Sequence, residues 1–216
     1  DATALLRAAD AALFRAKDLG RNRLCIHDPA MLVDASNRFR IEQALRKAID
    51  GGDFVLHYQP QVSLQSKQAI CVEALLRWRT SDTQIVPAGE FIRVAEQSGL
   101  MLDLNEWVLE TAAQAVRQWR DGGWPEARVA VNVSAQQFVA GDFIGSIERL
   151  LTRHGLPADA LELELTENML QTGAVTVDTL RRLAGLGVAT SLDDFGTGYS
   201  SLTSLEQLPL ACVKLD

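Results

Sequence analysis

Five segments with strand-like alternation carry polar side chains that can bind a metal ion or move a proton. These side chains are Glu73, Asn132, Glu164, the adjacent pair Asp193 and Asp194, and Lys214. In residues 161–166, LELELT, alternation puts the leucines on one face and Glu162 and Glu164 on the other. A strand inside a parallel sheet is usually apolar on both faces, so the acidic residues there require an explanation.

The charges of this set point to divalent cations. Burying several carboxylates without a positive partner costs several kcal/mol for each, and Lys214 supplies only a single positive charge. Mg²⁺ and Mn²⁺ favour oxygen ligands from carboxylates, amides and water. Adjacent aspartates can serve two ions about 4 Å apart, which clamps both oxygens of an in-line phosphoryl displacement. The pattern therefore predicts a site for Mg²⁺ or Mn²⁺, with two metals.

Each of these residues, taken alone, has a simpler interpretation. A single acidic residue at a strand end is more often solvated or ion-paired, and Lys214 could be a structural counter-ion. Arg77 could be a surface charge, and Glu167 could cap the loop that follows its strand. The three histidines share no metal-ligand spacing, so we interpret them as structural. The acidic set outweighs the simpler interpretation because it recurs on successive strands.

Alternating helical and strand-like segments position these residues from about residue 38 onward. The predicted strands are 54–62, 70–78, 128–134, 161–166, 188–194 and 212–216. Strands joined by crossover helices form a largely parallel sheet with both faces covered. Several repeats of this unit favour an α/β fold of the (β/α) barrel type over an open sheet. Active sites of such barrels lie at the C-terminal ends of the strands.

The first 28 residues have a different character. Residues 2–20 are alanine-rich with leucines near helical spacing, and Gly20 is a natural helix stop. Residues 21–28 are predicted to form a short strand. The helix either packs on the main domain or belongs to the tail of an upstream domain, and we favour the second. The predicted organisation is therefore 1–28, a linker at 29–37, and a main domain at 38–216.

Composition excludes several classes of protein. The formal net charge of −7 argues against binding to a DNA backbone, which needs clustered Lys and Arg. Three scattered cysteines fit neither a zinc motif nor a disulfide framework. We predict a cytoplasmic location, although a parent protein could be anchored in a membrane by segments outside this sequence. No apolar run approaches the roughly 18 residues of a membrane span.

An ordered set of segments resembles the EAL domain, a bacterial phosphodiesterase family that acts on cyclic di-GMP. The segments are YQP at 58–60, VEALLRW at 72–78, FIRVAEQSGL at 91–100, VNVSAQQF at 131–138, LELELTEN at 161–168, DDFGTGYSSL at 193–202 and VKLD at 213–216. The specificity lies in their order along the chain, since an EAL tripeptide alone has no weight. Residues 1–28 resemble the end of a GGDEF (diguanylate cyclase) domain, which commonly precedes an EAL domain.

The resemblance implies a modified TIM-type barrel with one antiparallel strand, and hydrolysis of cyclic di-GMP to linear pGpG. The implied metal ligands are Glu73, Asn132, Glu164 and Asp193, with Asp194 toward a second metal. The implied catalytic residues are Glu73, Lys214, Asp194 and Glu167. In this scheme Lys214 helps to position the attacking water, and Glu167 steadies the loop that carries the aspartates. Gln59 and Arg77 match positions that contact the substrate.

The resemblance also implies partners and limits. We expect a homodimer beside the 193–201 loop, together with an upstream GGDEF domain and sensor domains in the parent protein. Family members continue past the lysine strand, so we expect this barrel to be incomplete and the isolated chain to be inactive or poorly folded. The alternative function is a catalytically silent cyclic di-GMP receptor. A third interpretation, an unrelated metal-dependent lyase or isomerase, fits the carboxylates but not the ordered segments.

Overall fold

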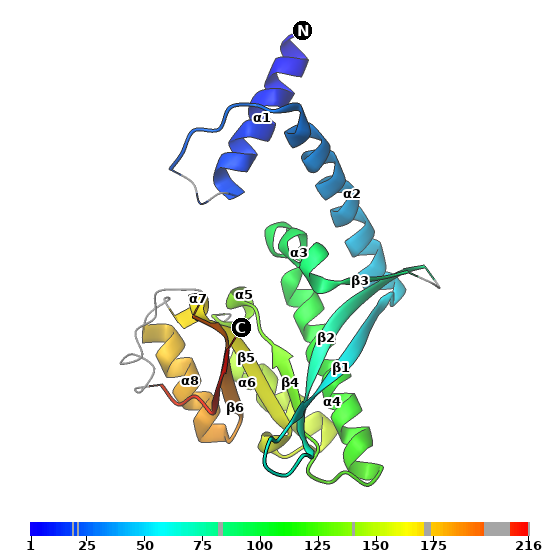
Figure 1. The fold of residues 1–216 in the computed structure, drawn as a ribbon, viewed down its shortest axis with the longest axis vertical. Helices are drawn as coiled ribbons and strands as arrows, with labels where there is room; N and C mark the ends of the chain where they lie inside the picture. Colours follow the sequence, from blue (N-terminus) through cyan, green and yellow to red (C-terminus); the bar gives the residue numbers. More distant parts are fainter. Residues whose placement is uncertain are drawn as a thin grey trace.

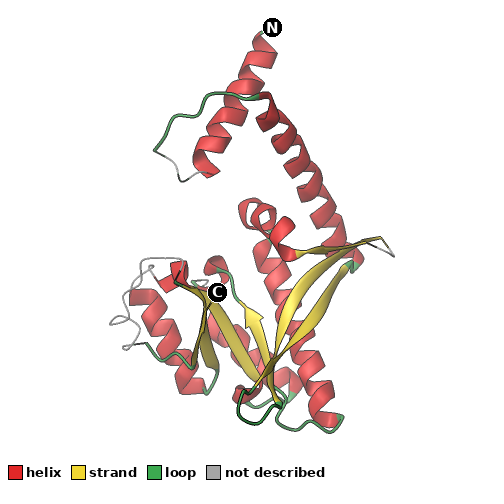
Figure 2. Cartoon of the chain, in the orientation of Figure 1, coloured by secondary structure: helices red, strands yellow, loops and turns green. Residues whose placement is uncertain are grey.

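A curved sheet with helices packed against it forms the main body of the computed structural model, and two N-terminal helices extend away from it (Figure 1). The structure describes residues 1–18, 20, 22–81, 84–139, 141–170, 174–196 and 208–215. Strands and helices alternate along most of the chain (Figure 2). The predicted α/β class is thereby confirmed.

Seven strands make up the sheet in the described part of the chain. They are β1 (Phe54–Val62), β2 (Ala69–Ser81), β3 (Gln84–Pro87), β4 (Val129–Asn132), β5 (Leu161–Thr166), β6 (Ala189–Phe195) and β7 (Cys212–Leu215). Their order is β1-β2-β4-β5-β6-β7, with β3 paired to β2. The pairs from β2 through β4, β5 and β6 to β7 are parallel, whereas β1 and β3 run antiparallel to β2. This is the wall of a TIM-like barrel whose first strand is reversed.

The helices connect and cover these strands. They are α1 (Ala2–Asp18), α2 (Pro29–Gly51), α3 (Ile92–Ser98), α4 (Met101–Asp121), α5 (Ala135–Phe138), α6 (Phe143–His154), α7 (Glu167–Leu170) and α8 (Ala174–Leu186), with single 3₁₀ turns at Ala88–Glu90 and Ala158–Ala160. The buried faces of α4, α6 and α8 meet the outward-facing leucines and valines of β4 and β5 in one continuous core. Because this face is apolar, the polar residues of the same strands face the barrel interior.

The N-terminal segment departs from one expectation. Residues 22–28 form no strand in the described structure, so the strand predicted at 21–28 is wrong. Leu24 and Ile26 are 86% and 80% exposed, and none of the strands that the structure describes pairs with this segment. The helix predicted at 2–20 does form, as α1, and Gly20 follows it with a left-handed φ of 103°.

The segment predicted as a linker, 29–37, is helical and continuous with the helix predicted after it. Asp28 caps the N-terminus of α2 by accepting a hydrogen bond from the Ala30 amide at 2.8 Å, and Pro29 occupies the first turn. At the other end, Gly52 stops α2 in a left-handed conformation with φ of 72°. A single long helix therefore leads from α1 to the first strand of the sheet.

Candidate active site

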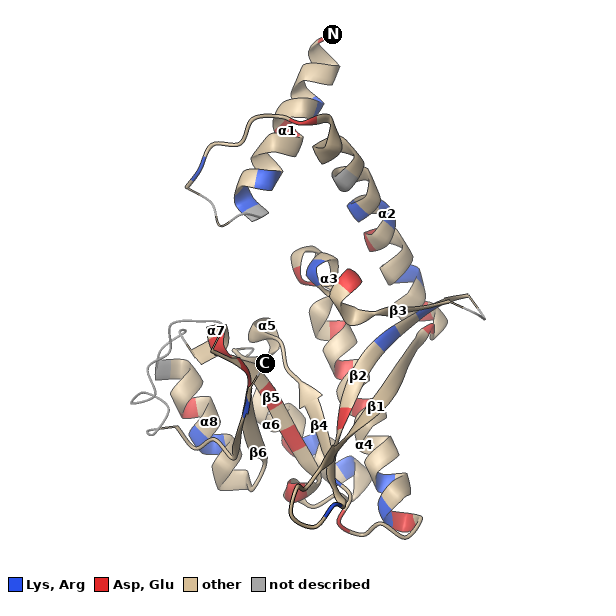
Figure 3. Ribbon diagram, viewed as in Figure 1, with Lys and Arg blue, Asp and Glu red and all other residues tan. Residues whose placement is uncertain are grey.

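Five parallel strands deliver the predicted polar residues to one region of the barrel interior. On β2, the even-numbered residues from Val72 to Trp78 are buried, whereas Glu73 lies on the opposite, partly exposed face. Asn132 pairs in register with Glu164, because β4 and β5 are neighbours. The red ribbon positions on β2 and β5 in Figure 3 show acidic residues on both strands. Alternation along each strand therefore decides which side chains enter the site.

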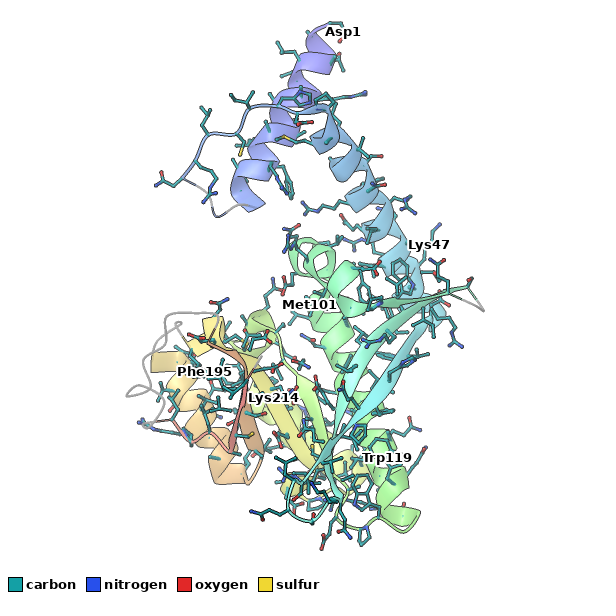
Figure 4. The ribbon with its side chains drawn as sticks, viewed as in Figure 1. Asp1, Lys47, Met101, Trp119, Phe195 and Lys214 are labelled. Atoms are coloured by element: carbon teal, nitrogen blue, oxygen red, sulfur yellow. The ribbon has the colours of Figure 1, made fainter. Side chains whose placement is uncertain are left out.

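Lys214 joins three of these acidic side chains. Its Nζ donates to Oε2 of Glu73 and to Oε1 of Glu164, both at 2.8 Å. The same Nζ lies 3.6 Å from Oδ1 of Asp193. Lys214, labelled in Figure 4, reaches them from β7, while the carboxylates come from β2, β5 and β6. One ammonium thus serves three carboxylates.

Asn132 ties two of the same carboxylates together. Its Nδ2 donates to Oε1 of Glu73 at 3.0 Å and to Oε2 of Glu164 at 3.2 Å. Glu164 is only 1% exposed, so its negative charge depends on these donors. The structure thus brings Glu73, Asn132, Glu164 and Lys214 into one hydrogen-bonded cluster, which Asp193 joins through its ion pair with Lys214.

The protonation of this cluster reflects an excess of negative charge. Burial raises the pKa of Glu164 to about 7, although the hydrogen bond from Lys214 opposes this shift. Burial also acts to raise the pKa of Glu73, but the hydrogen bond and charge of Lys214 outweigh it and hold that pKa below its usual value. Burial alone would lower the pKa of Lys214, yet its bonds to both glutamates raise it. Lys214 therefore stays positively charged, but its single charge does not balance the negative charge of the three carboxylates around it.

The cluster fits a divalent cation. Glu73, Glu164 and Asp193 each offer a carboxylate oxygen, and these oxygens lie within 4.8 Å of one another. When all three carboxylates are ionised, their negative charges exceed the one positive charge of Lys214 by two, the complement of one divalent ion. Asn132 can present its amide oxygen in place of its nitrogen, because the two atoms exchange on rotation of the amide. All these ligands are hard oxygen donors, which suit Mg²⁺ or Mn²⁺.

Two acidic residues that were predicted to act in this site lie beside the cluster. Asp194 follows Asp193 but is exposed and has a left-handed φ of 54°, a conformation that is uncommon for residues other than glycine. Glu167, which is 3% exposed, accepts a hydrogen bond from the Gly196 amide at 3.3 Å. Glu167 is therefore bonded to the backbone two residues after Asp194.

The two residues predicted to contact the substrate lie on β1 and β2, which form an antiparallel pair. Gln59 is exposed on β1, directly opposite Glu73 of β2. Arg77 shares a face of β2 with Glu73, is half-buried, and donates from Nη1 to the Leu76 carbonyl at 3.0 Å. Among the described contacts, neither side chain is bonded to the carboxylate cluster.

Sequence reasoning missed one member of the cluster, Gln61 of β1. Its Nε2 donates to Oε1 of Glu164 at 3.3 Å. The period-2 pattern of β1 puts Gln61 on the same face as Gln59. That pattern was the only available signal, because a glutamine on a strand has no charge that calls for a partner.

Comparison with known proteins identifies the family. The EAL domain model matches residues 42–216. The chain belongs to the EAL domain family. An EAL relative in Pseudomonas aeruginosa, the bifunctional diguanylate cyclase/cyclic di-GMP phosphodiesterase MucR, is 40% identical over 213 residues, covering 98% of this chain and 31% of the relative. The cyclic di-GMP phosphodiesterase PdeR of Escherichia coli is 35% identical over 217 residues, covering all of this chain and 32% of PdeR.

Solved EAL structures share this architecture. The MucR phosphodiesterase in complex with c-di-GMP superposes with a TM-score of 0.78 at 40% identity, covering 82% of this chain and 72% of that one. The TIM-like barrel fold predicted from the sequence is therefore confirmed. The EAL chain described here spans about a third of the length of MucR and PdeR. Its described helices include none with the length and apolar character needed to cross a membrane.

Proposed function

We propose that this EAL domain is a cyclic di-GMP-specific phosphodiesterase that hydrolyses one phosphodiester bond to give linear pGpG. The carboxylate cluster around Lys214 carries this proposal, since together with Asn132 it joins five strands at one place in the barrel. The names of MucR and PdeR, both phosphodiesterases of cyclic di-GMP, support the choice of substrate.

The proposed cofactor is Mg²⁺ or Mn²⁺. Glu73, Asn132, Glu164 and Asp193 would hold the first ion, and Asp194 would contribute to a second. When bound, these cations lower the pKa of water and neutralise the charge that develops on the phosphate. The net charge of the cluster and its oxygen donors support this assignment.

The residues around the cluster have proposed roles in the same reaction. Lys214 keeps its proton, because its pKa is raised, and so acts as a donor that orients the attacking water and not as a base. Water adds to phosphorus and the bond to the ribose 3′ oxygen breaks, because pGpG retains its phosphate on a 5′ oxygen. Gln59 and Arg77 would contact the nucleotide, and the guanidinium fork of Arg77 suits a phosphate.

Glu167 is proposed to hold the catalytic loop in place. Its hydrogen bond to the Gly196 amide fixes the backbone just after Asp193 and Asp194. The Glu167 carboxylate is buried, so removing it would leave the Gly196 amide without its acceptor. The end of β6, which carries both aspartates, would then lose this anchor. This contact supports a positioning role for Glu167.

The organisation of the parent protein is also a proposal. We infer that residues 1–28 are the C-terminal part of a GGDEF-like domain, joined through 29–37 to an EAL domain beginning at about residue 38. The bifunctional name of MucR supports this division, as does the short span of MucR that the chain covers. We further propose a cytoplasmic homodimer beside the 193–201 loop, of which residues 197–201 lie outside the described part of the chain.

A hydrolysis assay separates the enzyme from a silent receptor. The full-length protein is incubated with cyclic di-GMP and Mg²⁺ or Mn²⁺, and pGpG is followed by chromatography. We expect product from the wild type and from Glu126→Ala, which changes an exposed glutamate outside the site. Glu73→Ala should give no product. Tight binding of cyclic di-GMP by the wild type without pGpG would replace the phosphodiesterase with a receptor.

A further inference from the structure

Gln61 has no role in the reaction as described above, yet it contacts the most buried acid of the site. Its Nε2 lies 3.3 Å from Oε1 of Glu164 and donates a hydrogen bond to it. Gln61 and Glu164 come from β1 and β5, strands that are not neighbours in the sheet, so this bond crosses the barrel interior. We propose that Gln61 is a positioning residue that orients the Glu164 carboxylate for cation binding, an inference that rests on the proposed function.

The backbone of the first hairpin is irregular at this residue. Gln61 lies opposite Cys71, but the next residue, Val62, lies opposite Ala69, so the register shifts immediately after Gln61. Such irregularities bend a strand and re-aim the side chains beside them, and they are common next to active sites. The unpaired residue is Ile70 of β2, so the hairpin is irregular next to the position from which Gln61 reaches Glu164.

The bonds to Glu164 show what Gln61 adds. Oε1 accepts from both Lys214 and Gln61, while Oε2 accepts from Asn132. Lys214 and Asn132 also bond to Glu73, so they are shared between two acids. Gln61 is the donor among the described contacts that serves Glu164 without also serving Glu73. It therefore fixes the orientation of Glu164 independently of the rest of the cluster.

The chemistry of an amide suits this position. A second lysine beside Glu164 would repel an incoming cation and compete with it for the carboxylate oxygens. A neutral amide holds one lone pair of the carboxylate and leaves its negative charge available to the cation. Hydrogen-bond partners that orient metal ligands in this way usually contribute about 10- to 100-fold to metal affinity. For a single bond of 3.3 Å we expect the lower end of this range, about tenfold.

Mn²⁺ binding tests the proposal without depending on turnover. Free Mn²⁺ is titrated with the full-length protein and followed by electron paramagnetic resonance for the wild type, Gln61→Met and Gln68→Met. Methionine matches glutamine in length but lacks the amide. Gln68 is an exposed residue of the same hairpin, so it controls for the general effect of the substitution. Gln61→Asn, which keeps an amide but shortens its reach, guards against misfolding of the methionine variant.

The expected result is that Gln61→Met and Gln61→Asn bind Mn²⁺ about tenfold more weakly, while Gln68→Met binds as the wild type does. At saturating Mn²⁺, the KM for cyclic di-GMP should be unchanged, because Gln61 acts through Glu164. Wild-type Mn²⁺ affinity in folded Gln61 variants would overturn the proposal, and so would a raised KM with unchanged Mn²⁺ affinity. If the wild type itself binds no Mn²⁺, the proposed function fails and this inference fails with it.

Discussion

Replacing Lys214 with methionine tests whether the cluster holds more negative charge than the protein can balance. The ammonium makes two bonds of 2.8 Å to Glu73 and Glu164 and lies 3.6 Å from Asp193. The side chains of those two glutamates are 15% and 0% exposed, so removing the lysine leaves poorly solvated charges without a cation.

The expected loss is about 3 kcal/mol in the free energy of unfolding. Breaking a buried ion pair by removing one partner costs about 3–5 kcal/mol. The Lys214 side chain retains 25% exposure, so solvent screening places the loss at the lower end. Urea unfolding in EDTA measures it, with Lys47→Met as the control, because Lys47 is an exposed lysine of α2.

A divalent cation should reverse much of this loss. A ligand present at 100 times its dissociation constant stabilises the folded state by about 2.7 kcal/mol. Saturating Mn²⁺ should therefore restore most of the stability of Lys214→Met, and should stabilise this variant more than the wild type, in which Lys214 competes for the same oxygens. Equal stability of Lys214→Met and wild type in EDTA, or no response of either to Mn²⁺, would refute this reasoning.

Two further predictions concern the neighbourhood of the cluster. Glu167→Ala removes the acceptor of the Gly196 amide, so it should lower kcat severely and lower the free energy of unfolding by about 1–3 kcal/mol. An unchanged kcat in steady-state assays would show that this bond does not position the aspartates. In the folded chain at pH 8, Cys71 should resist a thiol reagent while the exposed Cys212 reacts. The reason is that burial raises the pKa of Cys71 to about 11, and the thiolate is the reactive form. Equal labelling of both cysteines, measured by mass spectrometry, would contradict this prediction.

The sequence predicted the strands well where alternation is strict. The predicted strands at 54–62 and 161–166 match β1 and β5 at both ends. In β5, leucines face the helices and glutamates face the interior, so the pattern alone places Glu164. The rule does not extend to Asp194, because its left-handed φ of 54° and the register shift between Leu192 and Phe195 interrupt the alternation at the end of β6.

Other features depend on contacts that a sequence pattern does not contain. The strand predicted at 21–28 has apolar alternation, but among the described strands none pairs with residues 22–28, and pairing is what makes a strand stable. The early start of α2 did have a signal, since Asp28 followed by Pro29 is a typical helix N-terminus. The bond from Gln61 to Glu164 joins β1 to β5, two strands that are far apart in the sequence and not neighbours in the sheet, so the pattern of β1 alone gives the face of Gln61 but not its partner.

The most direct test of the central claim is an anomalous difference map from crystals of the protein grown with Mn²⁺. The proposed metal site predicts a peak in contact with carboxylate oxygens of Glu73, Glu164 and Asp193, with Lys214 displaced from at least one of its present bonds. Crystals containing Mn²⁺ that show no peak there, and in which Lys214 still bridges Glu73 and Glu164 at 2.8 Å, would contradict the claim that this cluster is a divalent-cation site.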